Sequence, residues 1–152
     1  IFNNAHTIGV YKDSRILSTF RNSTLALCEG ANVVVFPECI EGYNHIVNQF
    51  QEGFVDIAKL YHKRSGKELL FVPMYNAPNL KTVCFGEPIR FRADAPKEAE
   101  RRRICQYLMD SITDLAVSLP RHTVVPYCNI PKKDYPSSIP SEERSRHEKA
   151  GG

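Results

Sequence analysis

Short apolar runs alternate along this chain with longer stretches whose apolar residues recur at helical spacing. The run of residues 33–36 (VVVF) is continuous and β-branched, which is typical of a strand buried on both faces. Strands that alternate with helices favour an α/β fold whose sheet is mainly parallel. We therefore expect a partial open, mainly parallel sheet flanked by helices. Its strands are expected at residues 7–11, 33–36, 69–74 and 82–85, and its helices at residues 16–28, 50–61 and 96–119, the last with an apolar face at residues 104–119.

Start and stop signals bracket two of these helices. Asp13 is a good N-cap residue before the first helix, and Gly30 supplies its C-terminal stop. Asp94 precedes the last helix and Pro120 ends it. Residues 39–49, between the second expected strand and the second expected helix, have the composition of a loop.

The two ends of the chain differ from its middle. Residues 131–152 hold several prolines and many charges, so we expect an extended or disordered tail after an α/β domain of residues 1–130. The chain opens at Ile1 on an apolar stretch, whereas a domain normally begins with a loose terminus. We therefore expect a fragment that lacks the N-terminal part of its fold.

Composition narrows the functional classes. With 152 residues, of which 42% are hydrophobic, the chain can bury a core. No stretch approaches the roughly 20 apolar residues of a membrane-spanning helix. The formal net charge of +3 allows an anionic substrate or a membrane surface. Basic and aromatic residues do not interleave as in single-strand nucleic-acid grooves, so we expect no nucleic-acid partner. The 5 cysteines lie far apart without a C-x-x-C pair, which indicates reduced thiols in a cytosolic protein and no zinc site.

The last expected helix carries both charge and core residues. Its three arginines at residues 101–103 stand beside Glu98 and Glu100, and we expect a solvated helix face there that could also touch anionic lipid head groups. Cys105 follows the expected core position Ile104, which predicts an inert packing thiol.

The most informative segment is CEGANVVVFPECIEGYN, residues 28–44. Its expected strand runs into Pro37 and Glu38, which places a carboxylate at the carboxyl end of a strand. In open α/β sheets ligands bind at that edge, so Glu38 is a candidate site residue. The alternative is that its carboxylate caps or pairs with a neighbouring loop.

Several segments of the chain, in the same order along the sequence, resemble those of the glycerolipid acyltransferases, the family of the lysophosphatidic acid (1-acyl-glycerol-3-phosphate) acyltransferases. Phe-Pro-Glu at residues 36–38 is similar to the start of the family's VVIFPEGTR-type block, although Cys-Ile-Glu at residues 39–41 replaces the usual Gly-Thr-Arg. The resemblance covers, in order, roughly residues 5–120. Its other segments are TIGVYK (7–12), FQEGFVDIAKLY (50–61), LLFVPMYNAP (69–78), KTVCFGEPIRF (81–91) and ITDLAVSLP (112–120).

The resemblance implies substrate-binding roles for four residues. Lys12 stands at the position of the family's phosphate-contacting arginine, and Arg15 is a second candidate one turn later. Pro37 fixes the turn, and Glu38 resembles the motif glutamate that shapes the acceptor pocket. For Lys12 the alternative is a solvated loop lysine.

The family's catalytic pair, His-x-x-x-x-Asp, is absent from this sequence. In that pair the histidine removes the proton from the acceptor hydroxyl, and the aspartate orients the ring. Five places after the histidines stand Tyr11, Phe50, Lys67, Tyr127 and Gly152, and none is an aspartate. We therefore assign no catalytic residue, and we expect the pair to precede Ile1 in a longer protein.

The implied parent activity is transfer of a fatty acyl group from acyl carrier protein or coenzyme A to a lysophospholipid hydroxyl. This reaction belongs to phospholipid synthesis and would place the protein in the cytoplasm, peripheral to the cytoplasmic face of a membrane. The resemblance implies no metal and no tightly bound cofactor. The chain alone is expected to be inactive.

Two alternatives stay open. Segments at residues 30–31 (GA), 36–38 (FPE) and 42–43 (GY) are similar to nitrilase-type amide hydrolases. In that reading Glu38 is the general base and Cys84 or Cys105 the nucleophile, although both thiols lie in apolar surroundings. The other alternative is a non-catalytic binding fragment.

Overall fold

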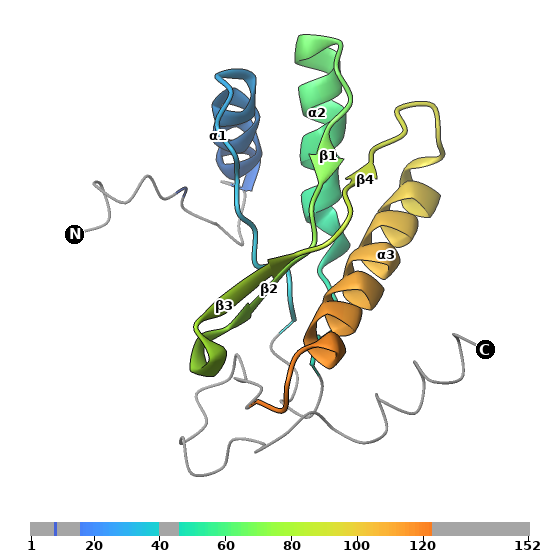
Figure 1. Cartoon of the computed structure of the whole chain (residues 1–152). Coiled ribbons are helices and arrows are strands. Elements are labelled where there is room, and N and C mark those ends of the chain that lie inside the picture. Colours follow the sequence, from blue (N-terminus) through green and yellow to red (C-terminus); the bar gives the residue numbers. More distant parts are fainter. Residues whose placement is uncertain (1–7, 9–15, 40–45, 123–152) are drawn as a thin grey trace.

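The computed structural model describes residues 8, 16–39 and 46–122. Over these ranges the chain forms three α-helices, two 3-10 helices and four short strands (Figure 1). Lys12, Arg15 and the expected tail at residues 131–152 lie outside the described residues. The elements in chain order are α1 (Ile16–Cys28), η2 (Glu52–Val55), α2 (Asp56–Ser65), β1 (Leu70–Phe71), β2 (Met74–Ala77), η3 (Pro78–Leu80), β3 (Thr82–Phe85), β4 (Ile89–Arg90) and α3 (Lys97–Ser118).

The helices end where the sequence carries stop signals. Gly30, after α1, has a φ of 87°, and the N–H of Ala31 donates to the carbonyl of Ala26 at 3.0 Å. A left-handed residue at this point closes the last helical turn, and glycine adopts it without a Cβ penalty. Helix α3 ends before Pro120, as the sequence predicts.

The four strands form two small antiparallel sheets, β1 with β4 and β2 with β3, which follow one another along a bent β-ribbon, residues 69–91 (Figure 1). The register changes between the paired residues Phe71–Ile89 and Met74–Phe85. Met74 lies three residues after Phe71, whereas Ile89 lies four residues after Phe85, so one strand has one residue more than the other between these pairs. The extra residue makes a β-bulge, which bends the ribbon.

A close approach of Gly86 to Pro73 fixes the bulge. The N–H of Gly86 donates to the carbonyl of Pro73 at 2.9 Å. A Cβ on Gly86 would lie 2.8 Å from Cγ of Pro73, which is closer than two such carbons can approach. A side chain at this position would therefore force Pro73 or the bulge to shift.

The expected mainly parallel sheet is wrong, because every strand pair among the described residues is antiparallel. Parallel neighbours need a crossover of a dozen or more residues, whereas β2 and β3 are joined by residues 78–81 alone. The expected strand at residues 33–36 is also wrong, because it forms no strand and its side chains are largely exposed. Val34 is 61% exposed and Phe36 is 72% exposed.

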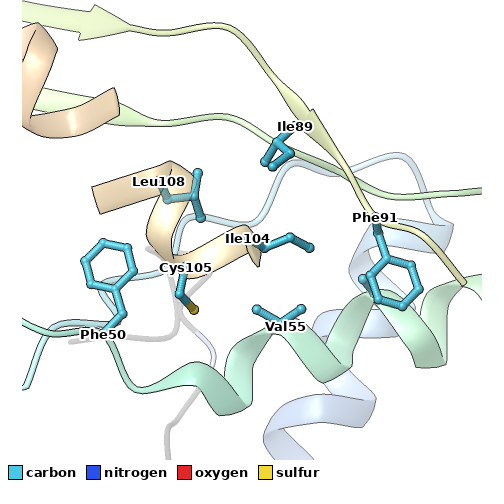
Figure 2. Close-up of a cluster of buried hydrophobic side chains, with 8 residues drawn as sticks. Phe50, Val55, Ile89, Phe91, Ile104, Cys105 and Leu108 are labelled. Atoms are coloured by element: carbon cyan, nitrogen blue, oxygen red, sulfur yellow. The ribbon is translucent and has the colours of Figure 1, made fainter. Parts of the chain in front are cut away.

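The core lies where α2, α3 and one face of the β-ribbon meet (Figure 2). Ile104 on α3 is fully buried at its centre, and Cys105 beside it is buried as predicted. The main cluster contains Phe50, Val55, Ala58, Ile89, Phe91, Ile104, Cys105 and Leu108. A second cluster, of Ile46, Tyr75, Ala77 and Ala116, continues along α3.

Helix α1 packs against α2 with a face that the apolar periodicity does not predict (Figure 1). Its buried residues are Thr19, Ser23 and Thr24, while Ile16 and Leu17 at its start are exposed. Short hydroxyl side chains permit a close helix approach, and Thr24 satisfies its hydroxyl by donating to the carbonyl of Phe20 at 2.8 Å.

Ion pairs at the start of α3 are more than a solvated helix face, which corrects the expectation for residues 98–103. Arg101 on α3 donates its Nε to Asp56 on α2 at 2.9 Å, and Lys97 Nζ lies 3.1 Å from the same carboxylate. Glu100 is buried, accepts from Arg103 Nε at 2.8 Å and accepts from the backbone N–H of Arg92 at 2.8 Å. These charges join α3 to α2 and to the end of the β-ribbon.

The Gly86–Pro73 contact predicts a specific cost for added volume. Gly86→Ala should lower the free energy of unfolding by about 1–3 kcal/mol, because the proline ring cannot rotate away from the new methyl group. Gly53→Ala is the matched control, since no atom lies within 4 Å of its added Cβ. Urea unfolding followed by circular dichroism measures both variants. Equal losses would show that the bulge tolerates a side chain.

The buried Glu100 predicts acid sensitivity. The hydrogen bond from Arg103 lowers the pKa of Glu100, burial opposes this, and the Arg92 backbone adds to the lowering. A carboxyl whose pKa is lower in the folded chain than in the unfolded chain stabilises the fold at pH values above the unfolded-state pKa, which is about 4.3. This stabilisation is lost as the pH falls through the pKa of the folded state. Glu100→Gln should therefore reduce the unfolding free energy at pH 7 by about 1–3 kcal/mol and flatten its decline below about pH 5.

The control for this variant is Glu98→Gln on the same helix turn, where the side chain is 61% exposed and pairs with Arg101 at 3.2 Å. An exposed pair contributes about 0–1 kcal/mol, so its pH profile should stay close to that of the unaltered chain. The same acid profile in both variants would contradict the assignment of Glu100.

Candidate functional site

Glu38 occupies a short antiparallel contact instead of the end of a parallel strand. It forms an isolated bridge with Phe50, and the N–H of Gln51 donates to the carbonyl of Pro37 at 2.8 Å. Phe50 is buried in the main core cluster, so the core sets the position of its bridge partner. Pro37 contributes a fixed φ and leaves no N–H to satisfy at this turn.

Asn48 holds the carboxylate of Glu38. Oε2 of Glu38 accepts from the backbone N–H of Asn48 at 3.0 Å and from its side-chain Nδ2 at 3.3 Å. This is the contact expected if Glu38 pairs with a neighbouring loop, and it also fixes where the carboxylate lies. The result is a carboxylate of set orientation directly after an exposed apolar segment.

Asn48 is the site residue that sequence reasoning missed. It is buried, and among the described residues its Oδ1 finds no hydrogen-bond partner. A buried acceptor without a donor lowers the stability of the fold by about 1–3 kcal/mol. The two hydrogen bonds that Asn48 donates to Glu38 offset this loss. No sequence signal marks it, because residues 39–49 have no periodicity and the contact spans ten positions.

Of the four sequence-predicted substrate-binding residues, the described ranges include Pro37 and Glu38. Pro37 and Glu38 are adjacent and half-buried, whereas Lys12 and Arg15 lie outside the described residues. Phosphate binding by Lys12 and Arg15 therefore stays a prediction.

Of the two candidate nucleophiles of the amide-hydrolase alternative, Cys105 is buried in the main core cluster. Burial raises the pKa of the Cys105 thiol to about 11, and the charge of Glu52 adds to the rise. A thiol with that pKa stays protonated near neutral pH and is a poor nucleophile. Cys84 is half-buried and lies opposite Tyr75 in the β-ribbon.

The two described histidines are engaged by groups other than carboxylates. His122 is buried, with Nε2 at 2.8 Å from the hydroxyl of Tyr75 and Nδ1 at 2.8 Å from the carbonyl of Pro120. Nδ1 of His62 lies 3.1 Å from the carbonyl of Lys67. Within the described ranges, neither ring forms the histidine–carboxylate pair that a base for acyl transfer requires.

A hollow opens between α2 and the start of α3, lined among others by Asp56, Lys59, Lys97 and Arg101. It has room for about one water molecule, so it is too small to enclose an acyl chain. Residues 16–39 and 46–122 contain no group of three or more His, Cys, Asp or Glu side chains placed to hold a metal ion. In the same ranges no helix has both the length and the apolar composition needed to cross a membrane.

A scan against models of known protein families, a search of curated proteins and a search of solved structures each found no match to this chain. The resemblance to glycerolipid acyltransferases therefore rests only on the sequence segments between residues 7 and 120 that occur in the same order as in that family.

Proposed function

We propose that this chain is the acceptor-binding part of a lysophospholipid acyltransferase, the enzyme class that moves an acyl group from acyl carrier protein or coenzyme A to a lysophospholipid hydroxyl. One observation carries the proposal: the exposed apolar side chains of residues 34–36 run directly into the fixed carboxylate of Glu38. The antiparallel strand pairing gives it no support, since a parallel sheet is absent from the described residues.

An apolar segment that ends in an oriented acceptor group suits an amphipathic ligand. Val34, Val35 and Phe36 offer surface for the acyl tail of a lysophospholipid. The carboxylate of Glu38 can accept a hydrogen bond from a glycerol hydroxyl while Asn48 keeps it in place. The phosphate of the acceptor is assigned to Lys12 by family resemblance, and Arg15, one turn into the following helix, is a second candidate.

Acyl transfer itself needs a base, and the His-x-x-x-x-Asp pair that supplies it in the resembled family is absent from this sequence. The acceptor oxygen attacks the thioester carbonyl, the hydroxyl proton passes to a base, and the thiol of the donor leaves. Without a His-x-x-x-x-Asp pair, the chain of 152 residues should bind the acceptor and show no turnover. The proposed cellular place is the cytoplasmic face of a membrane, with peripheral attachment.

Binding of a short-chain lysophosphatidate below its micelle concentration tests the proposal by isothermal titration calorimetry. Phe36→Ser should weaken binding about tenfold, because the ligand tail loses apolar contact worth about 1.5 kcal/mol. Glu38→Gln should weaken binding by about 3–10-fold, because a neutral amide is a weaker acceptor than a carboxylate.

Phe85→Ser is the matched control, since Phe85 is similarly exposed but lies on the β-ribbon. Its affinity for the monomeric lipid should equal that of the unaltered chain. No heat of binding to the unaltered chain, or equal affinity in all four proteins, would contradict the proposed acceptor site.

A further inference from the structure

Residues 33–36 are an apolar segment whose backbone makes no hydrogen bond within the described ranges. Val34 is 61% exposed, Val35 is 41% exposed and Phe36 is 72% exposed. Figure 1 shows this part of the chain as a drawn-out stretch that leaves the end of α1 and belongs to no helix or strand. The segment therefore exposes both its apolar side chains and its peptide groups.

The bridge between Glu38 and Phe50 shows why no strand forms here in the single chain. If both segments stayed extended, the antiparallel register of the bridge would place Phe36 opposite Glu52. Helix η2 begins at Glu52, so the second segment turns away at that point. Residues 33–36 are therefore left without a neighbouring strand.

The bridge also shows which edge of the segment is open. Extended backbone directs the peptide groups of alternate residues to opposite edges. The bridge uses the carbonyl of Pro37 and the N–H of Cys39, so odd-numbered residues point toward residues 49–51. Continued along the segment, this alternation directs the N–H and carbonyl of Val34 and Phe36 to the other edge, which we call the open edge. Pro37 has no N–H, but it lies on the bridged side and leaves the open edge intact.

The open edge lacks the features that protect strand edges from pairing. Proteins usually place lysine, another charge or a proline on such an edge. Residues 30–37 contain no charged side chain, and residues 33–36 are β-branched or aromatic, which favours strand structure. An edge of this kind accepts an added strand through main-chain hydrogen bonds.

A second copy of the same segment fits this edge. Antiparallel pairing centred on Val35 places Val34 opposite the partner's Phe36, and the two-fold symmetry repeats this apolar pair. Glu38 selects the direction, because parallel pairing in register would set two carboxylates side by side, whereas antiparallel pairing separates them. Since the bridge occupies the other edge at Pro37, the pairing closes as a dimer.

We propose that this protein forms a two-fold dimer in which the open edges of residues 34–36 pair as antiparallel strands. The N–H and carbonyl of Val34 bond to those of the partner's Phe36. Pairing uses the edge of the segment and leaves its faces open, so the inference goes beyond the proposed acceptor binding and does not depend on it. The partner's Phe36 lies on the same face as Val34 and adds apolar surface beside the candidate site.

Proline at two adjacent positions tests the pairing by sedimentation velocity over a protein concentration series. The unaltered chain should pass from monomer to dimer as the concentration rises. Val34→Pro removes an N–H from the open edge and should raise the dimer dissociation constant about tenfold or more, because the loss occurs twice in the symmetric pair. Val35→Pro is the matched control, since its N–H points to the other edge, and it should change the constant less than about threefold. Both variants should keep the urea midpoint of the unaltered chain, because the segment is exposed.

Complementary charges test the direction and register of the pairing. Val34→Lys and Phe36→Glu should each weaken self-association, because each introduces a charge opposite an apolar side chain. A mixture of the two variants should form a mixed dimer, since antiparallel pairing sets the introduced lysine opposite the introduced glutamate. A mixture of Val35→Lys with Phe36→Glu is the control and should stay monomeric, because position 35 lies on the opposite face.

Several outcomes would overturn the dimer. A monomer mass at every concentration is one, and equal weakening by Val34→Pro and Val35→Pro is another. Loss of the dimer in Phe85→Ser but not in Val34→Pro would place the contact on the β-ribbon, where Phe85 is also exposed. Growth beyond a dimer would contradict the closed pairing. Glu38→Gln should leave the dimer unchanged, so failure of the pairing and failure of the acceptor site are distinguishable.

Discussion

The bulge at Gly86 is the constraint on which the rest of the structure depends. It lets Tyr75 and Ala77 in one half of the β-ribbon and Ile89 and Phe91 in the other half face the same helix, α3. A regular ribbon of that length would turn one of these sets toward solvent, because a shift of one residue exchanges the two faces. The bulge requires a residue without a Cβ against Pro73, and the chain places glycine there.

The candidate site depends on the same core. Phe50 packs in the main cluster with Ile104 and Leu108, and its bridge to Glu38 fixes the backbone that carries the carboxylate. Asn48 then orients the carboxylate from two residues before Phe50. A change in the packing of α3 should therefore move the carboxylate of Glu38.

Local features of the sequence predict the local structure well. The bounds of β3 match residues 82–85, Gly30 follows α1 and Pro120 follows α3, because turn chemistry and helical periodicity act over a few residues. The pairing of strands was mispredicted because an apolar run does not specify its neighbour. Residues 33–36 have the composition of a doubly buried strand, yet Phe36 is among the most exposed apolar residues described. The Glu38–Asn48 contact was also missed, since it joins two irregular segments.

Nuclear Overhauser contacts between backbone protons test the central claim, an antiparallel ribbon with a bulge at Gly86. The account predicts cross-strand contacts from Met74 to Phe85 and from Phe71 to Ile89, with no single register that satisfies both. Contacts between residues 33–36 and 69–71 in a parallel pattern, or one unbroken register along the ribbon, would contradict it.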